Sequence, residues 1–218
     1  MSARRAALLV AAALLAASCG SGGDTAPDVG APSRNAAEFP VTIAAANGDV
    51  TIDEQPDAIV SISPTATEML FAIGAGEQVV AVDEQSNFPT DAPVTDLSGF
   101  EPNVEAIANY EPDLVVFSFD PGRLAKGLDK LGIPALLQPA AVTLEDTYEQ
   151  LEQLGDATGH PDEAGDVIAG MEKEIETIAA QVPEPEEQLT YYYELDDTYF
   201  TATSDTYVGT LFAKLGLE

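Results

Sequence analysis

Short apolar segments alternate with longer amphipathic ones through most of the chain. Four short runs are aliphatic or β-branched, as in strands buried on both faces of a sheet. Three segments between them have helical periodicity, and parallel strands require such crossover helices. The pattern predicts an open α/β lobe over residues 40–158, with strands at 58–62, 79–82, 114–118 and 135–137 and helices at 67–73, 104–110 and 123–131.

Other elements are predicted on both sides of this alternation. Residues 41–52 alternate around Asn47-Gly48, a dipeptide suited to a tight turn, which predicts a leading β-hairpin. An amphipathic helix is expected at 145–158, followed by a longer helix at 161–182. At 1.5 Å per residue the longer helix spans roughly 30 Å, enough to join two lobes.

Residues 188–218 are expected to begin a second α/β lobe, with a strand at 189–193 and a helix at 206–215. One strand and one helix would leave the apolar side of that helix poorly covered. We therefore expect the sequence to be a truncated form of a longer protein, with its second lobe incomplete.

The first residues have the features of a secretory leader. Residues 1–18 combine Arg4 and Arg5 with an apolar run that is too short for a comfortable membrane span, which predicts a signal peptide. Cys19 is the only cysteine, and its position at the end of the leader is typical of a lipoprotein cleavage site; a free thiol after ordinary cleavage is the alternative. Residues 19–39 are expected to form a flexible tether, which places the protein outside the cytoplasm, anchored to the cell membrane by lipidated Cys19.

Charge and composition exclude several functions. The chain has 38 acidic and 8 basic residues, a net charge of -30, and cannot offer nucleic acid a basic face. His160 is the only histidine, so a metal site built from several histidines is impossible. No glycine fingerprint follows the first core strand and no G-x-S-x-G motif is present. We expect neither enzymatic activity nor a cofactor.

Five sequence segments together resemble a known family: AIVSISPTATE (58–68), AIGAGEQVVAV (72–82), PNVEAIANYEPDLVV (102–116), LGIP (131–134) and LGDATGHPDEA (154–164). They are similar to the periplasmic binding proteins that serve ABC importers of vitamin B12, ferric siderophores and haem. The resemblance extends over residues 41–218. It implies a class III periplasmic-binding fold, in which a single long helix joins two Rossmann-like lobes with a cleft between them.

By this resemblance, the protein captures a metal chelate, a corrinoid such as cobalamin or a ferric siderophore, and delivers it to a permease. A haem- or chelate-binding sensor or scavenger that is not coupled to transport remains the alternative. Aromatic side chains at strand ends would supply flat apolar walls, although core packing is an alternative role for each of them. The predicted contacts lie in the loops that follow strands; they are Ser63, Pro64, Thr65, Gln85, Phe88, Phe100, Glu101, Phe117, Phe119, Asp120 and Tyr199.

Arg123 is the only base expected near these loops, which favours neutral or cationic ligands such as corrinoids or hydroxamate chelates. The resemblance also implies that Glu68 and Asp205 dock the lobes on basic residues of the permease, which in turn binds its ATPase. Helix capping is the alternative role for both acids: a capping box of Thr65 with Glu68, and an N-cap at Asp205, alone or shared with Ser204. The remaining expectations are a monomer and contact with the membrane only through the lipid.

Overall fold

The computed structural model describes residues 38–121, 123–183, 187 and 189–217. The predicted signal peptide, Cys19 and all but the last two residues of the predicted tether lie outside the described residues. Within the described part of the chain, no helix combines the length and the apolar character that a membrane crossing requires.

A parallel four-stranded sheet forms the centre of the lobe, in the order β4-β3-β5-β6. The strand predictions are confirmed to within one residue at each end. In the register, Ile62 pairs with Phe117 and Ser61 with Val82, so the loops that follow β3, β4 and β5 begin at one edge of the sheet. The strands are β3 (Ile59–Ile62), β4 (Val79–Val82), β5 (Leu114–Phe117) and β6 (Ala135–Leu137).

Helices cover both faces of this sheet, because alternate side chains of each buried strand point to opposite faces. Along β5, Leu114 and Val116 belong to one hydrophobic cluster, whereas Val115 and Phe117 belong to the other. The first cluster includes side chains of α1 (Pro64–Ala72), and the second includes side chains of α2 (Val104–Ala108) and α3 (Leu124–Asp129). The short 3-10 helix η1 (Ala75–Gln78) leads from α1 into β4.

The predicted hairpin consists of β1 (Val41–Ala45) and β2 (Gly48–Ile52), paired antiparallel. Its turn lies against the edge strand β6. The Asn47 side chain donates to the Ala135 carbonyl at 2.9 Å and accepts from the Leu137 N–H at 2.9 Å. On the opposite edge, the Val82 N–H donates to the Pro93 carbonyl and the Val82 carbonyl accepts from the Thr95 N–H. Both edges of the sheet are therefore hydrogen-bonded by other parts of the lobe.

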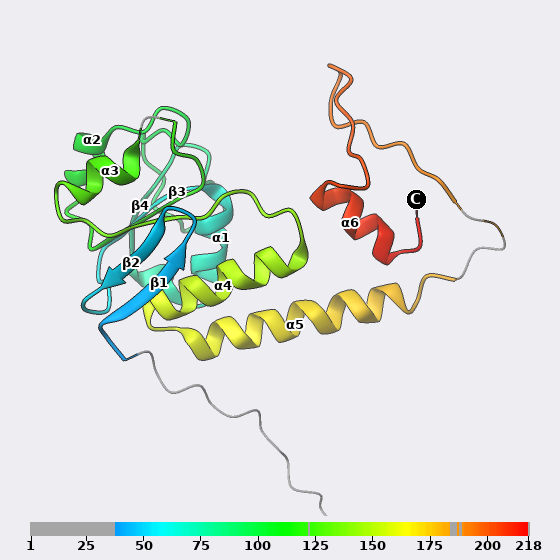
Figure 1. Cartoon of the computed structure of the whole chain (residues 1–218), viewed down its shortest axis with the longest axis horizontal. Helices are drawn as coiled ribbons and strands as arrows, with labels where there is room; N and C mark the ends of the chain where they lie inside the picture. Colours follow the sequence, from blue (N-terminus) through cyan, green and yellow to red (C-terminus); the bar gives the residue numbers. More distant parts are fainter. Residues whose placement is uncertain (1–37, 122, 184–186, 188, 218) are drawn as a thin grey trace, which may run out of the picture. The chain divides into compact units, whose positions relative to one another are not determined.

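Two helices, α4 (Leu144–Thr158) and α5 (Pro161–Ala179), run side by side after the sheet (Figure 1). Gly159 ends α4 at φ +83°, a conformation that glycine adopts without strain. The first half of α5 packs on the core through Ala164, Val167 and Ile168. Both helices are confirmed as elements; the role of α5 as a link between lobes stays a prediction.

The predicted strand at residues 189–193 is wrong. In the described residues this region forms only isolated bridges, from Leu189 to Leu217 and from Glu194 to Thr201. The helix α6 (Tyr207–Lys214) is present, and Phe212 lies 4.5 Å from Tyr191 between ring centroids. Phe212 of α6 is therefore in contact with tyrosine rings of this segment, and not with a β-sheet.

Candidate functional site

Loops after three strands enclose a pocket of about 410 Å³ at the carboxyl edge of the sheet. Parallel α/β sheets bind ligands at this edge, and the volume lies in the usual range for small-molecule sites. Phe100 and Phe119, which are 71% and 56% exposed, present flat apolar surface to this pocket, which we call the aromatic pocket. The pocket is lined by Ile62, Pro64, Asp83, Gln85, Gly99, Phe100, Ser118 and Phe119.

The start of α1 fixes one wall of the pocket. Pro64 is the first helical residue, where its missing N–H costs nothing and its fixed φ suits the helix. Ser63 is therefore the N-cap, and its hydroxyl accepts from the Ala66 N–H at 3.3 Å. The predicted capping box of Thr65 with Glu68 is wrong, because the helix begins one residue before Thr65. Glu68 lies beyond the first turn and is exposed.

Buried hydroxyl groups connect β3, α1 and the loop after β4. The Thr67 hydroxyl lies 2.8 Å from Ser61 Oγ and 3.2 Å from Ser86 Oγ. Ser86 Oγ donates to Asp83 Oδ2 at 3.1 Å. All four of these side chains are almost completely buried. Satisfied polar networks of this kind stabilise one arrangement of the surrounding loops.

Asp83 is a lining residue that is missing from the predicted contacts. It directly follows β4, its side chain is fully buried, and Oδ1 accepts from the Gln85 N–H at 2.7 Å. The sequence did offer a signal for Asp83: it directly follows a strand that is predicted to be buried on both faces. Charged residues are rarely buried, so an acid at this position indicates a specific role.

Ser63 and Thr65 lie at a neighbouring hollow of about 340 Å³ rather than in the aromatic pocket. Gln138, which follows β6, is buried beside them, and its Nε2 donates to the Gln150 carbonyl at 3.0 Å. Ser118 lines both hollows. The structure thus brings Pro64, Gln85, Phe100 and Phe119 to one pocket and places two other predicted residues at its neighbour.

Several predicted contacts lie elsewhere. The prediction that Phe117 lines the ligand site is wrong, because Phe117 is the last residue of β5 and its side chain is fully buried in the core with Val115. Phe88 is 61% exposed but is not among the lining residues, and neither is the exposed Glu101. Tyr199 is 82% exposed in the segment before α6.

Asp205 is also exposed, and it does not cap α6. The N-cap is Thr206, whose hydroxyl accepts from the Gly209 N–H at 3.2 Å. The predicted N-cap at Asp205 or Ser204 is therefore wrong by one or two residues.

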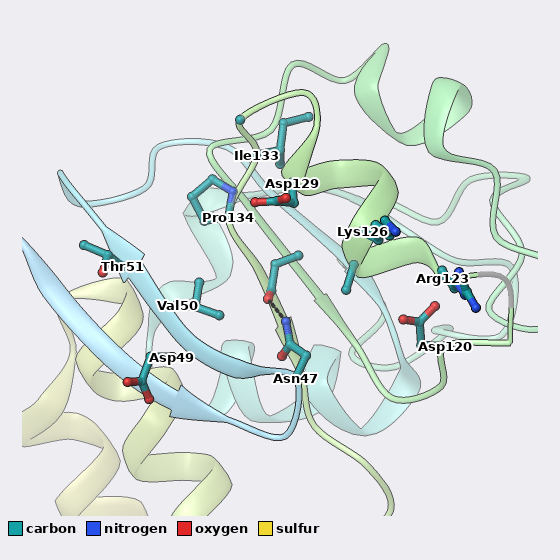
Figure 2. A pocket seen from close by; sticks show the side chains of 13 residues that line it. Asn47, Asp49, Val50, Thr51, Asp120, Arg123, Lys126, Asp129, Ile133 and Pro134 are labelled. Carbon is teal, nitrogen blue, oxygen red and sulfur yellow. Dashed lines mark hydrogen bonds between the residues drawn. The ribbon is translucent and has the colours of Figure 1, made fainter.

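Asp120 and Arg123 line a different hollow, of about 600 Å³, between the hairpin and α3. Figure 2 shows both side chains near the start of α3, with Val50 and Thr51 of the hairpin on the other side. The Asp120 carboxylate accepts from the Leu124 N–H and so caps the first turn of α3. The only base that the sequence places near the loops is therefore outside the aromatic pocket.

The described residues contain no group of three or more His, Cys, Asp or Glu side chains arranged to hold a metal ion. The lining of the pocket combines two exposed aromatic rings with the half-buried Ser118 hydroxyl and the buried Asp83 carboxylate.

Comparison with known proteins identifies relatives that are binding proteins. The chain is 32% identical to the uncharacterized ABC transporter substrate-binding lipoprotein YvrC of Bacillus subtilis over 93% of its length and 67% of that relative. It is 30% identical to a cobalamin-binding protein of Halobacterium salinarum, over 85% of this chain and 52% of the relative. A vitamin B12-binding protein of Vibrio parahaemolyticus is also 30% identical, over 66% of this chain and 54% of that relative. The chain spans about half to two thirds of the length of these relatives.

Solved structures share the fold. A possible iron-binding (periplasmic solute-binding) protein from Staphylococcus epidermidis superposes with a TM-score of 0.67 at 22% identity, over 76% of this chain and 67% of that chain. The periplasmic heme-binding protein HutB of Vibrio cholerae superposes with a TM-score of 0.64 at 24% identity, over 74% of this chain and 64% of that chain. These likenesses confirm the predicted α/β class III periplasmic-binding fold. The sequence model of the periplasmic binding protein family matches residues 59–218, and the chain belongs to this family.

Proposed function

We propose that this protein is the substrate-binding component of an ABC importer and captures a metal chelate, a corrinoid or a ferric siderophore, in the aromatic pocket. It binds the chelate without chemical change and delivers it to the permease. The family match and the named functions of the relatives support the class of protein. The class of ligand rests on the pocket itself.

The exposed rings of Phe100 and Phe119 carry the proposal. When a ligand covers large apolar side chains at the rim of a pocket, the removal of their surface from water stabilises the complex. Flat rings suit a flat or rigid apolar ligand such as a corrin or an aromatic chelate. The buried Asp83 and the half-buried Ser118 add polar groups to the same lining.

Lipidation of Cys19 would hold the protein at the outer face of the membrane, where its permease lies. The signal peptide predicted at residues 1–18, with Cys19 directly after it, and the name of the Bacillus relative support this placement. Glu68 on α1 and Asp205 before α6 are the proposed contacts with basic residues of the permease. Both side chains are exposed, as a docking contact requires.

Calorimetric titration of the complete protein with cyanocobalamin, haem and ferric hydroxamate and catecholate siderophores tests the proposal. We expect saturable one-to-one binding of at least one of them. Replacing Phe100 by alanine removes ring contact worth about 1–2 kcal/mol, so Kd rises roughly tenfold. Phe119→Ala has the same effect.

Phe88→Ala is the matched control, because Phe88 is similarly exposed but does not line the pocket. Its Kd remains within about twofold of wild type. If no chelate binds, the proposed ligand class is wrong. Equal losses for Phe88→Ala and Phe100→Ala would place the binding site elsewhere.

A further inference from the structure

Asp83 is a buried carboxylate at the aromatic pocket, and it has no basic partner among the described residues. Its side chain is fully buried. It accepts hydrogen bonds from the Gln85 N–H at 2.7 Å and from the Ser86 hydroxyl at 3.1 Å. In the part of the chain that the structure describes, the residues lining this pocket include no lysine or arginine, and no ion pair involves Asp83. Burying a carboxylate without an opposite charge costs free energy, so its presence calls for a reason.

Gly99 lies beside this carboxylate at the pocket, since a Cβ at Gly99 would lie 3.6 Å from Asp83 Oδ2. The Asp83 side chain has no exposed surface. Asp83 therefore acts on a ligand through its electric field rather than by direct contact. The field is strong because the intervening layer is protein, whose effective dielectric constant is well below that of water.

We propose that the buried Asp83 carboxylate sets the charge selectivity of the aromatic pocket, favouring chelates whose buried edge is neutral or cationic and rejecting those with an anionic edge. This inference rests on the proposed function and specifies its ligand class. Arg123, which would have opposed such a preference, lines the hollow beside the hairpin instead (Figure 2).

The competing explanation is that Asp83 only shapes the loop after β4. Its two hydrogen bonds form a local turn, and side chains of this kind often have that role alone. Asp83→Asn separates the two explanations. The amide keeps an oxygen for the Gln85 N–H and the shape of the side chain, but it removes the negative charge and replaces the oxygen that accepts from the Ser86 hydroxyl by an NH2 group.

The experiment measures Kd for ligand pairs that differ mainly in charge: cyanocobalamin and its monocarboxylic acid, haem dimethyl ester and haem, and ferrioxamine B and its N-acetyl derivative. For pairs that bind, wild type prefers the less negative or more cationic member by about tenfold. In Asp83→Asn that preference falls below about threefold. Glu84→Gln is the matched control: it removes the same charge from the neighbouring, exposed residue, where water and salt screen it, and keeps the wild-type preference.

A preference that is unchanged in Asp83→Asn, or lost equally in Glu84→Gln, overturns the inference and leaves the proposed function intact. Urea unfolding of the ligand-free variants shows that each variant is folded when Kd is measured. Asp83→Asn lowers the midpoint modestly, because the Ser86 hydroxyl loses its charged acceptor, and Glu84→Gln leaves the midpoint unchanged. If none of the ligands binds wild type, the proposed function fails and the inference fails with it.

Discussion

Asp146 joins the chain before α4 to the first turn of the helix. Its Oδ2 accepts from the Val142 N–H at 2.9 Å and from the Thr143 N–H at 2.8 Å, while the Thr143 hydroxyl accepts from the Asp146 N–H at 3.1 Å. The Val142 N–H, followed by the Thr143 N–H, holds the pKa of Asp146 below the ordinary value for an aspartate. The ionised side chain therefore stabilises the start of α4.

This arrangement predicts a pH dependence of stability. Because the folded pKa is lowered, the contribution is complete above the pKa of an unfolded aspartate, about 4, and is lost as pH falls through the folded value. We expect Asp146→Asn to have a lower free energy of unfolding than wild type at pH 7, with the difference narrowing below about pH 4. Urea unfolding between pH 3 and pH 7 measures it.

Glu145→Gln is the control for that prediction. It removes a charge from the same helical turn but leaves the hydrogen bonds of Asp146 in place. A difference between wild type and Asp146→Asn that is independent of pH would contradict the assignment.

The direction of single side chains was the least predictable property of the site. Phe117 and Ser118 are neighbours, but only Ser118 lines the pocket, because Phe117 ends β5 with its side chain in the core and Ser118 begins the following loop. The predicted strand ended one residue later, at 118, so the sequence did not separate the last core residue from the first loop residue. Pro64 had a similar effect on α1, since it moved the cap from Thr65 to Ser63.

At the scale of elements, the contact between α4 and α5 depends on a glycine. A Cβ at Gly155 would lie 2.6 Å from the Ala164 Cβ and 3.0 Å from the His160 carbonyl oxygen. The two helices therefore approach too closely for a side chain at this position. Gly155 lies in α4, whereas Gly170 lies in α5 and has nothing within 4 Å of its Cβ position.

These glycines predict opposite effects of the same substitution. Gly155→Ala forces the helices apart and lowers the free energy of unfolding by about 1–3 kcal/mol. Gly170→Ala raises it by up to about 1 kcal/mol, because alanine is the better helix former. Urea unfolding of the two variants measures both changes, and a loss of stability in Gly170→Ala would show an unrecognised contact on that face of α5.

Buried strands and amphipathic helices were predictable from residues 40–179, because their periodicity is dictated by the faces they bury. The segment at 189–193 was not, since an apolar run becomes a strand only when another strand pairs with it. Leu189 instead makes a single bridge to Leu217. Local sequence contains no information about whether a partner strand is present.

At the scale of the whole molecule, negative charge predominates, with 38 acidic residues against 8 basic ones. Such a surface favours encounters with basic partners and affects their rate and orientation more than their final affinity. Among the exposed acids of the lobe, Glu68 is the one proposed to dock on the permease.

Glu68→Ala therefore tests transport separately from binding. We expect an unchanged Kd for the chelate and an uptake rate reduced about fivefold or more, measured in vesicles that contain the cognate permease and ATPase. Glu77→Ala, an exposed acid on η1, is the control and retains normal uptake. Weaker chelate binding in Glu68→Ala would assign Glu68 to the ligand site, and full uptake would exclude it from docking.

The hydrogen bonds along the two borders of the sheet have a consequence for the protein in crowded surroundings. The Asn47 carboxamide occupies a backbone donor and a backbone acceptor of β6, and residues 93–95 do the same for β4. Unpaired borders are the sites at which β proteins recruit strands from other molecules and polymerise. With both borders of this sheet occupied, copies of the lobe at high local concentration cannot join their sheets edge to edge.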